Sequence, residues 1–106
     1  MKSLIALQDA MGATTTALMR SDASFAVTLA AGQAKTVAVP AEARVMLFNA
    51  TGDVWVRFGG AAAVPSNDIL DGSAPELNPV ARAVAGVASI GLAAPTACVA
   101  NLVFYR

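Results

Sequence analysis

The sequence predicts an all-β fold: an antiparallel β-sandwich or a jelly-roll-like small barrel with an extended N-terminal arm. From residue 24 onward, apolar and polar side chains alternate with period two, which is the pattern of half-buried strands. Turn-forming residues interrupt this alternation about every ten residues, as they do in sandwiches and small barrels. Hydrophobic residues make up 57% of the 106 residues and charged residues only 13%, a composition that excludes intrinsic disorder.

The chain divides into residues 1–23, an arm or first strands, and residues 24–106, the sandwich domain. Segments 3–7 and 13–19 read as strands, because Thr favours sheets. An arm that becomes ordered only against neighbouring subunits is a second interpretation, since chain ends are seldom fixed unless they are tied down. A helix is the third, with one face formed by Leu4, Leu7, Met11 and Leu18.

The segment 44–58 is the centre of the predicted fold. The turn residues Thr51-Gly52-Asp53 separate two alternating runs, so we predict a tight β-hairpin. Side chains alternate along each strand, and this turn fixes which of them share a face. One face carries Val45, Leu47, Val56 and Phe58, and the other carries Met46, Phe48, Trp55 and Arg57. Both faces are largely apolar, and both need cover.

The remaining strands follow the same alternation. Segment 24–29 is a clean half-buried strand, and Pro40 places the next strand at a sheet edge or ends it, because proline cannot donate to the ladder. Further strands are predicted at 36–39, 61–64, 80–85, 87–92 and 98–105. A short helix is the alternative for 79–85, because Ala and Arg are good helix formers and Pro79 suits a first helical position.

The longest loop spans residues 65–79, and loops of this length in compact domains are often functional. Asp68 and Asp71 within it suggest calcium binding, but the spacing of carboxylates in a calcium loop is missing. Aspartates that cap turns are the favoured interpretation.

Residue types that support catalysis or metal binding are scarce. The chain has no histidine and a single cysteine, so it lacks the usual zinc ligands and cannot form an internal disulfide. Cys98 lies in a strand pattern, where a free cysteine behaves as a small hydrophobe, and a lone cysteine fits synthesis in a reducing cytoplasm. We therefore expect no enzyme activity, no catalytic residues, no bound metal and no cofactor.

Charge and hydropathy limit the partners. The formal net charge is zero and the basic residues are scattered, whereas nucleic-acid binding needs a basic cluster. Segment 83–105 has no charged residue, but Pro95 and its alternating texture argue against a membrane-spanning helix. Gln8 and Asp9 interrupt the N-terminal apolar run before it reaches the length of a secretory signal. We expect neither nucleic-acid nor membrane binding, and near-zero charge favours self-association.

The Trp55 face of the predicted hairpin has two interpretations, as plain core or as a protein–protein anchor, because Trp and Arg are enriched where partners dock. With the long loop added, the predicted interface consists of Met46, Phe48, Trp55, Arg57, Asp68, Asp71 and Leu77.

Five segments carry a resemblance to a known family: 48–59, 71–79, Arg82, 88–95 and 102–105. Together they resemble the small β-rich virion proteins encoded among the head and tail genes of tailed bacteriophages, over residues 25–106. The resemblance implies a structural protein of the virion, made in the host cytoplasm. It would be a capsid decoration (cement) subunit or a head–tail component, with its own copies, the major capsid protein or other virion proteins as partners.

Two other functions stay open. One is a receptor- or carbohydrate-binding module at a tail tip, with Trp55 as a stacking platform and loop 65–79 as its rim. The other, of lower weight, is a hydrolase that uses acidic residues of the turns, namely Asp53, Asp68, Asp71 and Glu76.

Overall fold

The computed structural model describes the backbone of residues 1–106 and all side chains except those of Leu7, Thr15 and Thr16. The described backbone forms ten strands and no helix, so it contains no helix that is able to cross a membrane. The strands are β1 (Ala6–Gln8), β2 (Thr14–Leu18), β3 (Ser24–Leu29), β4 (Ala34–Ala38), β5 (Val45–Ala50), β6 (Trp55–Phe58), β7 (Glu76–Leu77), β8 (Ala81–Ala83), β9 (Ser89–Ala93) and β10 (Cys98–Tyr105). The predicted all-β class is confirmed.

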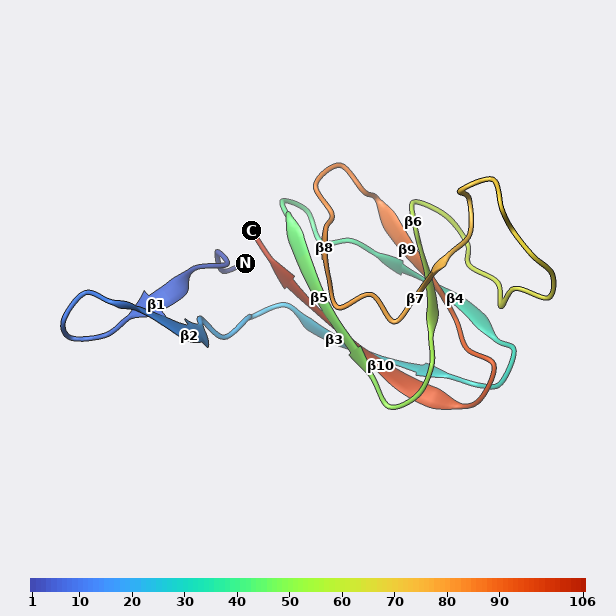
Figure 1. The fold of residues 1–106 in the computed structure, drawn as a ribbon, viewed down its shortest axis with the longest axis horizontal. Coiled ribbons are helices and arrows are strands. Elements are labelled where there is room, and N and C mark those ends of the chain that lie inside the picture. The colour runs from blue at the N-terminus through green and yellow to red at the C-terminus, as the bar shows by residue number, and fades with distance from the viewer.

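Eight of the described strands form two antiparallel four-stranded sheets that pack face to face (Figure 1). One, the β10 sheet, has the order β3-β10-β5-β8, and the other, the β9 sheet, has the order β4-β9-β6-β7. The pairs β3/β10, β4/β9, β5/β8 and β6/β7 are therefore successive parts of one long hairpin whose tip is the connection 59–75. Rolling such a hairpin into two sheets gives the strand order of a jelly roll.

The core lies between the two sheets. Each long strand contributes every second side chain to it, as the alternation predicts; in β10 these include Leu102 and Phe104, both fully buried. The ring of Phe25 from β3 meets that of Phe104 edge-on, with the ring centroids 5.4 Å apart. Cys98 is a free, half-buried cysteine that packs against this core.

The predicted hairpin over 44–58 is wrong. β5 pairs with β10 and β8, whereas β6 pairs with β9 and β7, so the chain crosses from one sheet to the other between Ala50 and Trp55. The physical reason lies in the two apolar sets. A hairpin would place Met46 and Val56 on opposite faces, but the crossing buries both in one interior, each 0% exposed.

Basic side chains reach across both open edges of the sandwich. Between β4 and β3, the Lys35 ammonium donates to the Thr28 carbonyl oxygen at 2.6 Å. Between β8 and β7, the Arg82 guanidinium contacts Glu76 Oε1, with its Nη2 at 2.8 Å and its Nε at 2.9 Å. Charged side chains at sheet edges hinder pairing with another chain, so these residues protect the sheet edges as well as joining the sheets.

The structure settles the secondary structure of three other segments. Segment 61–64, predicted as a strand, is irregular because it crosses over the β9 sheet instead of joining it. Segment 79–85 contains the strand β8 and not a helix, since its backbone pairs with β5. Residues 1–23 contain the antiparallel pair β1–β2 and no helix.

The molecule is elongated, with principal extents of 53 × 26 × 24 Å. Figure 1 shows the β1–β2 hairpin, hereafter the arm, projecting from one end of the sandwich and the connection 59–75 from the other. The two chain termini lie close together at the base of the arm (Figure 1).

Candidate interaction site

An open groove of about 460 Å³ lies within the connection 59–75. Its wall is mostly apolar, formed by segment 61–65 together with Ile69 and Pro75. Arg57 supplies a positive charge at the groove and donates from Nη2 to the Ser73 carbonyl oxygen at 3.0 Å, which joins β6 to the far side of the loop. The volume lies within the range of sites that take a small ligand or a single anchoring side chain.

Gly91 on β9 allows the loop to form this groove. A Cβ at this position would collide with the Gly60 carbonyl oxygen and lie 2.5 Å from the Ala62 amide nitrogen. The backbone of residues 60–62 therefore runs directly over β9, a close approach that only a glycine permits. This contact fixes the start of the groove wall on the outer face of the β9 sheet.

A capped turn shapes the far side of the loop. Asp71 Oδ1 accepts hydrogen bonds from the Ser73 hydroxyl at 2.6 Å and from the Ser73 backbone amide at 3.0 Å. These bonds, the hydroxyl one above all, favour the ionised form and lower the pKa of the Asp71 carboxyl below its usual value. The turn-capping interpretation is thus confirmed for Asp71.

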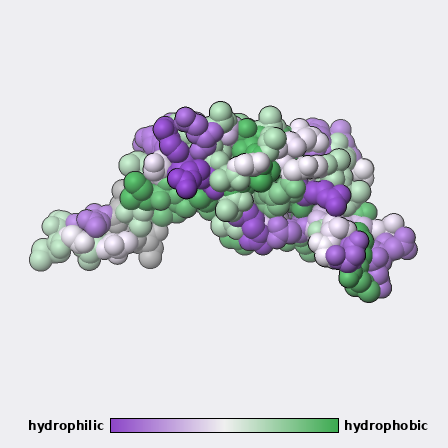
Figure 2. Space-filling model, turned by 90° about the horizontal axis from the view of Figure 1, so that it is seen from above, coloured by the Kyte–Doolittle hydropathy of each residue, from purple (hydrophilic) through white to green (hydrophobic). Residues whose placement is uncertain are grey.

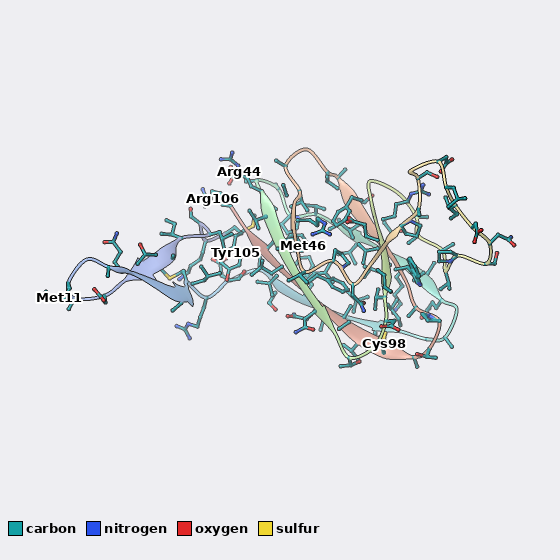
Figure 3. All side chains as sticks on the ribbon, viewed as in Figure 1. Met11, Arg44, Met46, Cys98, Tyr105 and Arg106 are labelled. Atoms are coloured by element: carbon teal, nitrogen blue, oxygen red, sulfur yellow. The ribbon has the colours of Figure 1, made fainter. Side chains whose placement is uncertain are left out.

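The base of the arm is tied to the C-terminal end of β10. Tyr105 donates its hydroxyl to the Met19 carbonyl oxygen, and Ser21 donates its hydroxyl to the Phe104 carbonyl oxygen, both at 2.7 Å. On the other leg of the arm, the Arg106 amide donates to the Lys2 carbonyl oxygen at 2.7 Å. Figure 3 shows Tyr105 and Arg106 at this junction, so the arm starts from a fixed base.

The tip of the arm exposes an apolar side chain. Asp9 Oδ1 accepts from the amides of Met11 and Ala13, and Gly12 adopts a positive φ of 82°, which together form the turn. Met11 at this turn is 91% exposed and lies at the far end of the arm in Figure 3. Ile5 is also largely exposed along the arm.

The structure places some residues of the predicted interface in the core and others on the surface. Met46 is 0% exposed and Phe48 only 7%, so both are core residues and their assignment to an interface is wrong. They face the interior because the chain crosses between sheets after β5. Trp55, on the other sheet and half-buried, does not line the groove, whereas Arg57 does. The side chains of Asp68, Asp71 and Leu77 are exposed, and their role at an interface remains a prediction.

Sequence reasoning missed two exposed apolar side chains outside the arm. Leu70, in the 59–75 loop, is 90% exposed, and Val80, just before β8, is 75% exposed. An apolar pair, Ile69-Leu70, within a turn-rich loop was the available signal for the first of these. Figure 2 shows apolar surface at the loop end of the molecule, beside polar atoms.

Among the side chains that the structure describes, no group of three His, Cys, Asp or Glu residues is placed to hold a metal ion. Comparisons with protein-family models, curated proteins and solved structures give no match. The fold and its exposed surfaces are therefore the basis of the functional inference.

Proposed function

We propose that the chain is a non-enzymatic structural subunit of a bacteriophage virion, a capsid decoration protein that bridges and stabilises neighbouring shell proteins. One observation carries this proposal: the arm and the 59–75 loop project from opposite ends of the sandwich, and each carries an apolar side chain that is almost fully exposed to solvent. These side chains are Met11 on the arm and Leu70 in the loop. Each end has a second exposed apolar side chain, Ile5 on the arm and Ile69 in the loop, and a gathering of exposed apolar side chains marks a site where another protein docks.

Two contact regions at opposite ends suit a bridging role. Each buries apolar area on docking, at about 25 cal/mol per Å², so a subunit that touches two neighbours adds stability to the shell without a covalent link. The long axis of 53 Å separates the two contacts, so both ends are free to engage different neighbours.

The architecture agrees with this role. Jelly rolls form many viral capsid proteins, but they also form lectins and cupins, so the fold supports the proposal by analogy only. The resemblance of residues 25–106 to small virion proteins favours the capsid among these uses.

Co-sedimentation tests the proposal. Shells assembled from the major capsid protein of a tailed bacteriophage are mixed with purified protein, pelleted, and analysed for bound subunit in a fixed ratio to the shell protein. We expect saturable binding and a higher melting temperature of the decorated shell. Protein that stays in the supernatant at every concentration contradicts the proposal.

A head–tail or tail component is the second candidate, because the same two contact regions serve a ring or tube as well as a shell. Saturable binding to isolated tails, with none to shells, would favour it. The carbohydrate-binding alternative has less support, since Trp55 does not line the groove that the loop forms.

A further inference from the structure

We propose that the arm tip of one copy docks in the 59–75 groove of a second copy, so that subunits associate head to tail. The inference names a partner for the proposed structural role, and so it rests on that role. Its test needs no shell or tail.

The arm stands apart from the sandwich, so contact with a partner would stabilise it. Among the described strands, β1 and β2 pair only with each other, and they project away from the sandwich (Figure 1). A two-stranded hairpin is at best marginally stable alone in water, and this one is tied to the sandwich at its base. Its tip nevertheless holds Met11 at 91% exposure, an arrangement that becomes favourable when the side chain is buried against another molecule.

The groove at the other end of the molecule matches this tip. Methionine is unbranched and flexible, so it fills irregular apolar spaces such as the groove wall formed by segment 61–65 and Ile69. Asp9 lies two residues before Met11 and directs Oδ1 into its own turn, where it accepts from the Met11 and Ala13 amides; it carries a negative charge at the arm tip. Arg57 lines the groove and is positively charged. A Met11 side chain in the groove would bring these opposite charges together.

The position of the two surfaces dictates the type of assembly. They lie at opposite ends of the molecule and differ from each other, so the contact is heterologous and is repeated from copy to copy, giving rings or filaments. A dimer made by exchanging two arms would instead use the same surface twice.

Paired interface variants test the inference. Met11→Asp places a charge at the tip, and Ala63→Trp fills the groove from an exposed position in its wall. Mass is measured by light scattering after size exclusion, over a wide concentration range. We expect the wild type to form species larger than a dimer and each variant alone to be a monomer. The equimolar mixture should give a 1:1 heterodimer that grows no further, because one intact arm meets one intact groove.

One control and one further test variant accompany these variants. Val80→Asp changes an exposed apolar side chain outside both surfaces and should assemble as the wild type does. Asp9→Asn keeps the turn acceptor and removes only the charge; it should weaken association by up to about fivefold, the effect of an exposed ion pair, and less so at high salt. Circular dichroism of each variant shows whether it is folded.

Three outcomes overturn the inference: a wild type that is monomeric at all concentrations, a folded Ala63→Trp variant that assembles normally, or a mixture that stays monomeric. If Met11→Asp loses assembly and Ala63→Trp does not, the subunits associate by exchanging arms and not by arm-to-groove docking. If the protein is monomeric but still binds shells, this inference is wrong and the proposed function stands. If the protein assembles head to tail but binds neither shells nor tails, the inference stands and the proposed function is wrong.

Discussion

Asn78 and Val54 exchange two hydrogen bonds at the point where the chain crosses between the sheets. The Val54 amide donates to Asn78 Oδ1 at 2.8 Å, and the Asn78 amide donates to the Val54 carbonyl oxygen at 2.9 Å. Asn78 Nδ2 also donates to Asp53 Oδ1 at 3.0 Å. Asn78 has a φ of 46°, in the left-handed region that asparagine tolerates better than most residues. One side chain thus stabilises the crossing from β5 to β6.

Replacing Asn78 should destabilise the fold in two separable steps. Asn78→Gly removes the acceptor for the partly buried Val54 amide but suits the positive φ, so we expect a loss of about 1–3 kcal/mol in the free energy of unfolding. Asn78→Ala adds the strain of a left-handed alanine, about 1 kcal/mol more. Urea unfolding measures both. Equal losses in the two variants would show that the backbone conformation contributes nothing.

Gly91 should be intolerant of any side chain. Gly91→Ala forces the 60–62 backbone away from β9, and overpacking of this kind costs about 1–3 kcal/mol. NMR spectra should show amide shifts concentrated in the groove wall. Gly60→Ala is the matched control, because its Cβ would meet only the Arg57 Cδ, at an ordinary 3.6 Å. Equal stability of Gly91→Ala and the wild type would contradict the close crossing.

Substituting one buried and one exposed methionine distinguishes a core position from a surface position. Met46→Ala deletes a fully buried side chain and should lower the free energy of unfolding by about 2–5 kcal/mol. Met11→Ala removes a side chain that is 91% exposed, so in dilute protein it should change stability by less than about 0.5 kcal/mol. Thermal or urea unfolding compares them. A mild effect of Met46→Ala would reinstate the interface interpretation of that residue.

The Asp71 carboxyl should titrate below the usual pH, because Ser73 donates two hydrogen bonds to its ionised form. Ser73→Ala removes the stronger cause, so the pKa of Asp71 should rise towards its ordinary value. Since the folded-state pKa is the lower one, the stabilisation is present above the unfolded-state pKa and is lost as the pH falls through the folded-state pKa. Carbon-13 NMR of the side-chain carboxyl follows the titration. Ser66→Ala, which leaves these bonds intact, is the control; an unchanged pKa in Ser73→Ala would refute the cap.

Strand positions were the predictable part of this fold. The sequence predicts strands at 24–29 and 98–105 in which every second side chain faces inward, and the structure has β3 and β10 there with the expected side chains inward. The segment 61–64 was mispredicted because small apolar residues satisfy a strand pattern equally well when they form a coil over Gly91.

The candidate site was harder to predict than the fold. Arg57 and the long loop were both identified from the sequence, and the structure brings them together in one groove. Met46 and Phe48 belong with them only if the turn Thr51-Gly52-Asp53 closes a hairpin, which it does not. That turn permits either a hairpin or a crossing, and the local sequence does not distinguish the two.

By itself, the sequence determined that this chain is built of strands and which side of most strands is apolar, because alternation is a property of a few consecutive residues. The tertiary structure decided which strands pair. Phe104 lies opposite Met46, and Asn78 holds Val54, contacts between residues more than twenty positions apart. Such pairings follow from burying both apolar sets in one interior, a condition that only the whole chain can satisfy.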